Sequence, residues 1–289
     1  MIRRKKFTLH LPSRKLVLGE RTLIMGVLNV TPDSFSDGGQ FLDARSAVEH
    51  AFQMERSGAD ILDIGGESTR PGSRGVSAQQ ELDRILPVLN QLRGRLKIPI
   101  SIDTQKAEVA EAAVKAGAEI INDISALRSD PELAKVARRH RLPVILVHMR
   151  SAPRTMQQGP FARNVLRDVT RGSREALARA KRFGIAKSQI ILDPGIGFGK
   201  SYAQNFELLA RLPELASLGY PLLVGTSRKA FIGHALGKVA AEQRIWGTAA
   251  TVTASILGGA HIVRVHDVAE MVQVAKIADA IAKAARKNS

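Results

Sequence analysis

The sequence predicts the α/β class, because eight strand-like stretches alternate with helix-like stretches along its 289 residues. Most of the strand-like stretches are continuous runs of Ile, Leu and Val, as expected for parallel strands buried on both faces. An open, doubly wound sheet is compatible with this alternation. A closed (β/α)8 TIM barrel fits eight strands in this length better, since about 250 residues is typical of that fold.

The strand-like stretches are, in order, 23–29, 60–66, 98–104, 119–125, 143–149, 189–195, 221–227 and 261–267. Before them, "KFTLHL" and "KLVLGE" alternate apolar and polar residues and flank "PSR". This pattern predicts a short N-terminal β-hairpin that closes the bottom of the barrel. We expect a single domain, with the hairpin in residues 1–20, the barrel core in 22–267 and a C-terminal helix in 268–289.

Several predicted helices carry start signals. Ser77 precedes an amphipathic stretch and Gln80 follows three residues later, which predicts a capping box. A second helix is expected to start at Thr104. A third has Asp130 as the expected N-cap and Pro131 at the first helical position. The first two of these stretches end at Gly94 and Gly117, as expected at helix C-termini.

The chain is strongly basic, with 43 basic and 27 acidic residues and a net charge of +16. Apart from Arg3–Lys6, the basic residues are scattered over helix-like stretches, and aromatic residues make up only 4% of the chain, too few for a base-stacking platform. This distribution argues against nucleic-acid binding beyond a secondary role for the N-terminus, whereas a small anionic substrate suits the charge. The absence of cysteine, of a secretory signal and of a long apolar run predicts a cytoplasmic protein without membrane spans.

Every predicted strand ends in a polar residue. In TIM barrels the carboxyl ends of the strands converge on the active site, so these side chains should share one pocket. Caps and turns explain single cases but not all eight. The strand ends are Asn29, Asp63, Asp103, Asn122, His148, Asp193, Ser227–Lys229 and Arg264–His266.

The residue types indicate what the pocket binds. Asp103, Asn122 and Asp193 offer carboxylate and amide groups, which suit a flat heterocycle rich in N–H donors. His148 follows a buried strand and is interpreted as a core histidine rather than a ligand. Together with a cationic edge, these acceptors predict a pocket for a polar ring that carries an anion.

Cationic and hard-oxygen groups complete the pocket. Lys229, Arg264 and His266 suit a phosphate group. Asn29 and nearby loop oxygens could hold Mg²⁺, a hard cation that binds largely through water and substrate phosphates.

Three loops are candidate binding segments. "DPGIGFGKS" (193–201) fails as a phosphate loop because position 194 is proline; its glycines are expected to turn beside a ligand and to leave Phe198 exposed at the mouth. The connections at about 29–41 and 65–77 are long, as in lids and binding loops. Thr69 and Arg70 in the latter could reach an anion.

Seven segments of the chain are distinctive: "GVLNVTPDSFSDGG", "DIGGESTRPG", "SIDT", "IIND", "LDPGIGFGK", "SRKAFIG" and "VRVHDV". Through them the chain resembles the dihydropteroate synthases, of the pterin-binding barrel superfamily. The resemblance covers about residues 22–267 in the family's order and looks like the stand-alone bacterial type. One departure is Ile196, where relatives often carry Phe, which should alter packing and not chemistry.

The resemblance implies that the chain joins a dihydropterin diphosphate to 4-aminobenzoate, with Mg²⁺ as cofactor and Asn29 as its ligand. It also implies a homodimer, for which the region around Trp246 is a candidate surface. Catalysis would fall to Asp103, Asp193 and Lys229. The implied pterin residues are Asp103, Asn122, Asp193, Lys229, Met149 and Gly225; the diphosphate residues are Arg264, His266 and Thr69; the 4-aminobenzoate residues are Arg70, Pro71, Phe198 and Ser227.

Two alternatives are left open. A folate-binding methyltransferase of the same superfamily would share the pterin carboxylates but would not need "STRPG", "SRK" and "RVHD", which are present here. A binding or regulatory protein that kept the barrel without activity would not need a filled site.

Overall fold

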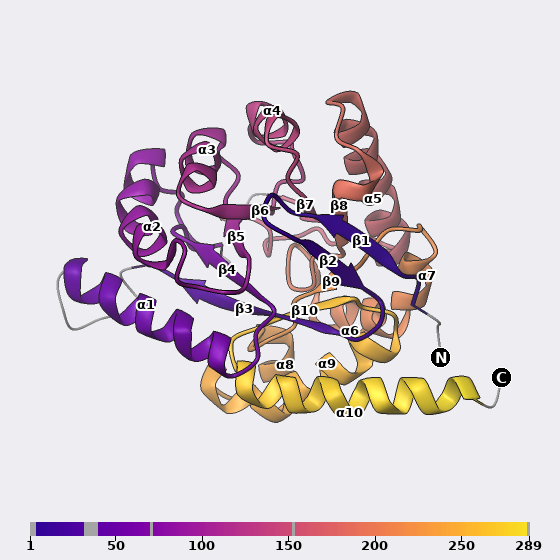
Figure 1. Cartoon of the computed structure of the whole chain (residues 1–289). Helices are drawn as coiled ribbons and strands as arrows, with labels where there is room; N and C mark the ends of the chain where they lie inside the picture. Colours follow the sequence, from indigo (N-terminus) through magenta and orange to yellow (C-terminus); the bar gives the residue numbers. More distant parts are fainter. Residues whose placement is uncertain (1–3, 32–39, 70–71, 152–153, 288–289) are drawn as a thin grey trace.

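The computed structural model describes residues 4–31, 40–69, 72–151 and 154–287. Its main sheet has eight parallel strands in the order β8-β7-β6-β5-β4-β3-β10-β9 (Figure 1). A bridge between Leu192 and Leu222 joins the two edges, so the sheet closes into the predicted TIM barrel. The strands are β3 (Leu23–Asn29), β4 (Ile61–Gly65), β5 (Ile100–Asp103), β6 (Ala118–Asp123), β7 (Val144–Val147), β8 (Ile190–Asp193), β9 (Leu223–Val224) and β10 (Ile262–Val265).

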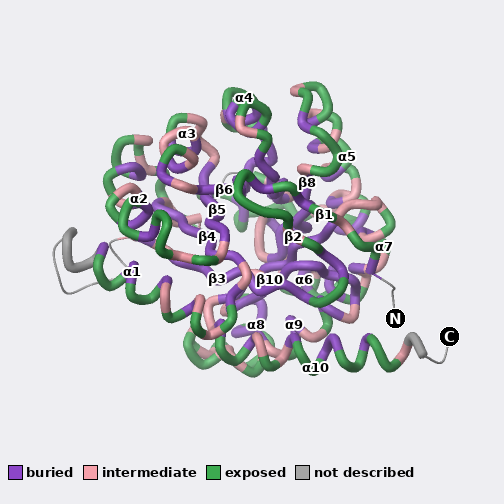
Figure 2. Tube along the Cα trace, viewed as in Figure 1, coloured by how far each residue is buried: buried purple, intermediate pink, exposed green. Residues whose placement is uncertain are grey.

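Helices surround the barrel and bury one face each against it. Figure 2 shows this as buried residues on the strands and on the inner sides of the helices, with exposed residues outside. No described helix is both long enough and apolar enough to cross a bilayer. The helices are α1 (Gln40–Arg56), α2 (Ala78–Leu92), α3 (Ala107–Lys115), α4 (Glu132–Arg139), α5 (Val165–Arg182), α6 (Tyr202–Ala210), α7 (Leu212–Ala216), α8 (Ala230–Ala235), α9 (Ile245–Leu257) and α10 (Val268–Lys287).

The helix starts agree with the sequence only in part. The Ser77–Gln80 capping box is present at α2. The start at Thr104 is wrong, because the Thr104 amide donates to the Asn122 carbonyl at 3.1 Å and so continues the strand ladder. Helix α4 begins one residue late, with Pro131 as its N-cap.

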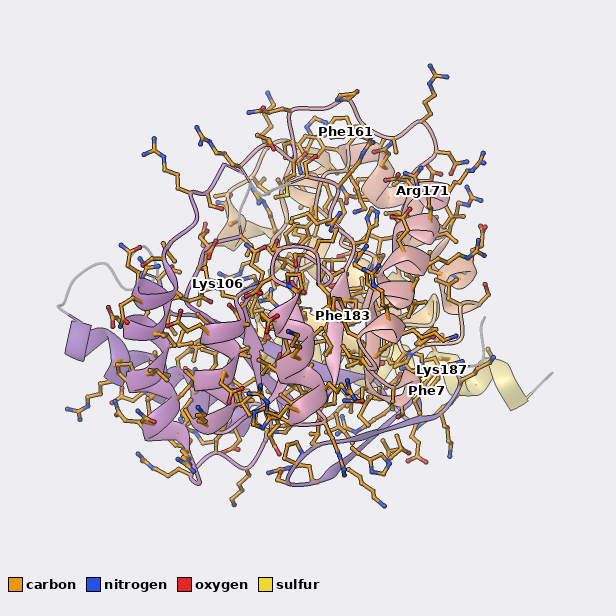
Figure 3. The ribbon with its side chains drawn as sticks, turned by 90° about the horizontal axis from the view of Figure 1, so that it is seen from above. Phe7, Lys106, Phe161, Arg171, Phe183 and Lys187 are labelled. Atoms are coloured by element: carbon orange, nitrogen blue, oxygen red, sulfur yellow. The ribbon has the colours of Figure 1, made fainter. Side chains whose placement is uncertain are left out.

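The N-terminal hairpin of β1 (Phe7–His10) and β2 (Lys15–Leu18) is antiparallel, as predicted. Its Leu9 and Leu18 are buried in the same apolar cluster as Met25 and the other residues that fill the barrel interior. The hairpin therefore covers the amino ends of the strands. Figure 3 shows the two ends of the barrel, with Phe7 of the hairpin at one end and Phe161 of the β7–α5 connection at the other.

A buried ion pair ties the start of the chain to its last helix. Arg4, 6% exposed, donates through Nη1 to Thr22 Oγ1 at 2.7 Å and to the Ala260 carbonyl at 3.1 Å. Its Nη2 donates to Asp279, which also accepts from the Thr22 amide at 2.7 Å. Both charges are thus removed from water and depend on each other.

Replacing Arg4 with Met should destabilise the fold strongly, because it leaves the Asp279 carboxylate buried without its cation. The expected loss is about 3–5 kcal/mol in the free energy of unfolding, measured by urea denaturation. Lys6→Met is the control, since Lys6 forms an exposed ion pair with Glu20 and should lose little. Equal losses in the two variants would contradict this assignment.

Candidate active site

Arg264 organises the carboxyl end of the barrel. From β10 its Nε donates to Asp63 Oδ2 at 2.6 Å and its Nη2 donates to Asp103 Oδ2 at 2.9 Å. Asn122 Nδ2 donates to the same Asp63 oxygen at 3.0 Å. The four side chains come from β10, β4, β5 and β6, so one network joins both sides of the barrel. We call these four residues the rim cluster.

The strand register places these groups at one level. Asp103 pairs with Asn122 on β6 and with Gly65 on β4, so the two polar side chains are neighbours across the ladder. A β-carbon at Gly65 would lie 3.4 Å from Asp103 Cβ. A larger residue there would therefore crowd the Asp103 carboxylate.

The cluster keeps unused acceptor atoms. Within the described residues, Asp63 Oδ1 and Asn122 Oδ1 are buried without a hydrogen-bond partner. Buried polar atoms are normally paired, so an unpaired acceptor inside a pocket indicates a place for a donor from a ligand. This fits the predicted flat ring with N–H donors.

Burial raises the pKa values of the carboxyl groups. Desolvation, with Asp63 nearby, raises the pKa of Asp103 to about 7 although Arg264 opposes the rise. Desolvation also raises the pKa of Asp193, opposed by Lys229 and by the hydrogen bond from the Gly195 amide.

Lys229 lies at the end of the β9 unit and faces the Gly-rich turn after β8. It donates to the Ile196 carbonyl, and its Nζ is 4.8 Å from the Phe198 ring centroid. Gly197 has φ +86°, and a β-carbon there would lie 2.9 Å from Lys229 Cδ, so the glycine permits this close passage. Burial lowers the pKa of Lys229 to about 8, opposed chiefly by Asp193.

Two expectations about this turn can be compared with the structure. Phe198 is half-buried and not exposed, because it packs against the apolar cluster inside the barrel and its ring lies beneath Lys229. Ile196 is fully buried in the larger apolar cluster, which strands and helices form together, consistent with a packing role for its side chain.

Three further predicted residues, Ser227, Met149 and Gly225, follow β7 and β9. Ser227 is buried, and its Oγ lies 3.0 Å from His266 Nδ1 and accepts from the His266 amide at 3.1 Å. Met149 is buried in the apolar cluster inside the barrel, and Gly225 lies beside Arg264.

Asn29 and Thr69 are half-buried at the end of β3 and after β4. Within the described part of the chain, no hydrogen bond links their side chains to the rim cluster. Arg70 and Pro71 lie outside the described residues.

Sequence reasoning undervalued two residues. Asp63 was noted only as a polar strand end, yet it is fully buried and holds both Arg264 and Asn122. A charge inside an apolar strand, "ILDIG", is the signal that could have identified it, because a buried charge needs a partner. Lys200 was seen only as part of the Gly-rich segment, yet it is 2% exposed.

The fold and the rim cluster define a barrel enzyme for a polar ring, and comparison with known proteins agrees. Residues 25–266 match the family model described as pterin binding enzyme, and the chain belongs to that family. It is 50% identical to a dihydropteroate synthase of Synechocystis over 91% of both chains, and 45% identical to that of Bacillus subtilis over 94% of this chain and 93% of the relative.

Solved structures show the same likeness. A Xanthomonas albilineans dihydropteroate synthase with 4-aminobenzoic acid has a TM-score of 0.90 and 43% identity, over 96% of this chain and 98% of that one. A Yersinia pestis dihydropteroate synthase with a sulfonamide drug has a TM-score of 0.88 and 44% identity, over 97% of this chain and all of that one.

The pKa of Asp103 predicts pH-dependent binding of a pterin that lacks the diphosphate. Below about 7 the carboxyl is protonated and loses acceptor capacity, so affinity should rise about tenfold from about pH 6 to about pH 8. Fluorescence titration of the pterin measures this change. Asp103→Asn should bind more weakly and without that dependence; an unchanged pH profile in this variant would refute the assignment.

Proposed function

We infer that the protein condenses (7,8-dihydropterin-6-yl)methyl diphosphate with 4-aminobenzoate to give 7,8-dihydropteroate and pyrophosphate, a transferase reaction of folate biosynthesis. The observation that carries this is a single rim on which buried acceptors, Asp103 and Asn122, adjoin the Arg264 guanidinium. Relatives across most of the chain are named dihydropteroate synthases, and one solved relative holds 7,8-dihydropteroate.

The rim suggests how the reaction proceeds. The pterin ring would be held by Asp103, Asn122, Asp193 and Lys229, with Met149 and Gly225 lining its slot. The bond between the methylene carbon and the diphosphate oxygen would break first, the electron pair leaving with the diphosphate. Asp103 and Asp193 would stabilise the resulting cationic methylene, since buried fixed charges act strongly where charge develops.

Departure of the diphosphate needs positive charge, and the rim supplies it. Arg264 and His266 would bind the leaving group, together with Thr69. The amine of 4-aminobenzoate would then attack the methylene carbon, form the C–N bond and lose a proton. No enzyme nucleophile is required, and a covalent enzyme–pterin adduct would contradict this order.

The second substrate would bind beside the turn after β8. Phe198 and Ser227 would border its site, completed by Arg70 and Pro71 of the long 65–77 connection. The sequence predicts the 29–41 connection as a lid over the same substrate, and residues 32–39 of it lie outside the described residues.

Mg²⁺ is proposed as the cofactor, with Asn29 as its protein ligand. The described residues contain no group of three or more His, Cys, Asp or Glu side chains placed to hold a metal. This fits an ion that binds chiefly through water and substrate phosphates and takes few protein ligands. When bound, it would neutralise charge on the departing diphosphate.

The methyltransferase alternative is less well supported. It would use the pterin acceptors but has no need for a cationic edge at Arg264 and His266. Methyl transfer from a folate in the absence of any pyrophosphate release would favour it.

The direct test is pyrophosphate release with Mg²⁺, the dihydropterin diphosphate and 4-aminobenzoate, with chromatography for dihydropteroate. Lys229→Ala and Asp103→Ala should each lower kcat/KM by about a hundredfold or more, as expected when a preorganised charge is removed. Lys115→Ala, on the outer face of α3 and 71% exposed, is the control and should stay active. Pterin binding without product would contradict the synthase assignment.

We also propose that the protein is a homodimer through the face of α9 and α10. These helices pack on each other and expose large apolar side chains, with Trp246 at 81% and Ile277 at 65%. A cytoplasmic location and the absence of nucleic-acid binding stay predictions from the sequence.

The dimer predicts a solution mass of about twice the 31.3 kDa chain by light scattering. Trp246→Glu should shift the protein to the monomer mass, because it places a charge in the interface. Lys115→Glu, on α3, is the matched surface control and should stay dimeric. A monomeric native protein would defeat the proposal.

A further inference from the structure

We propose that Lys200 is a positioning residue that fixes the Gly-rich turn after β8, and through it the Phe198 side of the second-substrate site. The inference rests on the proposed synthase reaction and names a residue outside the sites expected from the sequence. It stands on the convergence of the turn's carbonyl groups on one buried ammonium.

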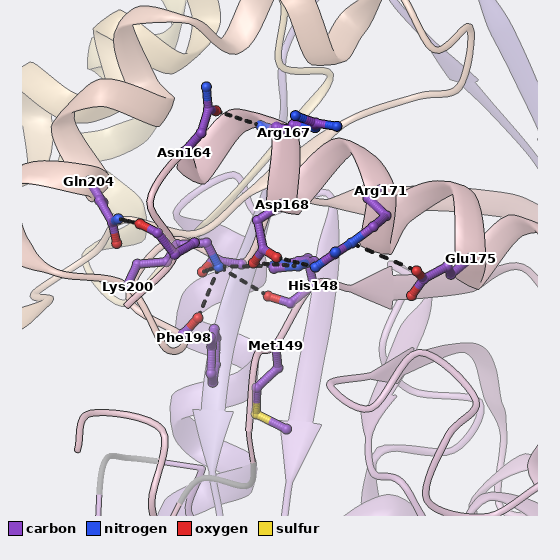
Figure 4. A network of polar contacts seen from close by, with 12 residues as sticks. His148, Met149, Asn164, Arg167, Asp168, Arg171, Glu175, Phe198, Lys200 and Gln204 are labelled. Atoms are coloured by element: carbon purple, nitrogen blue, oxygen red, sulfur yellow. Dashed lines mark hydrogen bonds and ion pairs between the residues drawn. The ribbon is translucent and has the colours of Figure 1, made fainter. Parts of the chain in front are cut away.

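Lys200 donates hydrogen bonds to carbonyl groups of the turn. Its Nζ donates to the Gly195 carbonyl at 2.8 Å, to the Phe198 carbonyl at 2.9 Å and to the His148 carbonyl at 3.2 Å (Figure 4). The first two acceptors belong to the turn and the third to the chain just after β7. One side chain therefore joins both ends of the turn to the neighbouring strand unit.

A histidine extends this network to α5. His148 Nδ1 lies 3.1 Å from Lys200 Nζ, and its Nε2 lies 3.7 Å from Asp168 (Figure 4). Burial, with Lys200 nearby, lowers the pKa of His148 well below its usual value, so the neutral ring can accept from the lysine. His148 thus serves as a core histidine, as its sequence context indicated.

Other hydrogen bonds also hold the turn, from the Gly197 amide to Asn205 and from Gln157 to the Gly197 carbonyl, and Lys200 adds the link to the segment after β7. Gly195 has φ +66°, and a β-carbon there would lie 1.9 Å from the His148 carbonyl oxygen, so the two segments are already in contact. Without Lys200, the carbonyl groups of Gly195 and Phe198 would lose this donor. Burial lowers the pKa of Lys200 to about 7, but Asp193 opposes this, and four surrounding acceptors favour the ammonium form.

The Gly-rich turn also contacts Lys229. The Ile196 carbonyl of the turn accepts a hydrogen bond from the Lys229 ammonium, and the same ammonium lies over the ring of Phe198. Displacement of the turn therefore moves the wall of the 4-aminobenzoate site directly. It moves the pterin acceptors of the rim cluster less, because those are held by Arg264.

The test is Lys200→Met, assayed with both substrates varied. The KM for 4-aminobenzoate should rise about 10- to 100-fold, as expected when a reacting partner is misplaced. The KM for the dihydropterin diphosphate should change less, because the turn contacts Lys229 but Asp103 and Asn122 are held in the rim cluster. Lys200→Gln, which keeps donors without the charge, should recover part of the loss and serves if the Met variant does not fold.

Arg4→Met is the matched control, because it removes a buried cation at the opposite end of the barrel. It should lower the melting temperature without changing the ratio of the two KM values. If Lys200→Met and Lys200→Gln behave like Arg4→Met, with a lower melting temperature and an unchanged ratio of the two KM values, Lys200 has only a structural role and the proposal is overturned. Equal increases in both KM values would also overturn it.

A second readout separates this inference from the synthase reaction. Amide hydrogen exchange in residues 195–199 should speed up in Lys200→Met without substrates, whereas Arg4→Met should change exchange near the N-terminal hairpin. If exchange speeds up in Lys200→Met but the wild type lacks synthase activity, the positioning role is upheld and only the reaction is rejected. Unchanged exchange in an active enzyme would reject the positioning role.

Discussion

The ion pairs of Arg264 with Asp63 and Asp103 are the constraint on which the carboxyl end of this barrel depends. A guanidinium and two carboxylates removed from water are costly unless they are paired with good geometry. Here the fork of Arg264 reaches one carboxylate with Nε and the other with Nη2, and Asn122 adds a further donor to Asp63. The pairing holds β4, β5, β6 and β10 at one level around the pocket.

The same arrangement explains why the site is chemically prepared before substrates arrive. Within the described residues Asp63 Oδ1 and Asn122 Oδ1 take no part in these bonds, so they stay available to a donor from a ligand. Buried dipoles and charges that are already oriented need little rearrangement during a reaction, which is the basis of electrostatic preorganisation. The elevated pKa of Asp103 and the lowered pKa of Lys229 reflect this dry, charged environment.

The sequence predicted the barrel, its eight strands and the N-terminal hairpin, because continuous apolar runs and capping residues are local signals. It also predicted that polar strand ends meet, since closure of the barrel forces them together. It could not predict which of them pair. The role of Asp63 depends on Arg264, 201 positions later, and that of Lys200 on three carbonyl groups that carry no side-chain signal. The start of α3 was missed because a tertiary hydrogen bond holds Thr104 extended.

The barrel wall is not equally strong around its circumference. Seven neighbouring strand pairs are joined by ladders, but β8 and β9 meet through the single Leu192–Leu222 bridge and a hydrogen bond from the Leu192 amide to the Pro221 carbonyl at 2.9 Å. Separating β8 from β9 therefore breaks fewer backbone hydrogen bonds than separating any other pair of neighbouring strands. The Gly-rich turn and Lys229 follow the two strands that flank it, so the most compliant line of the cylinder runs beneath the side of the pocket assigned to the second substrate.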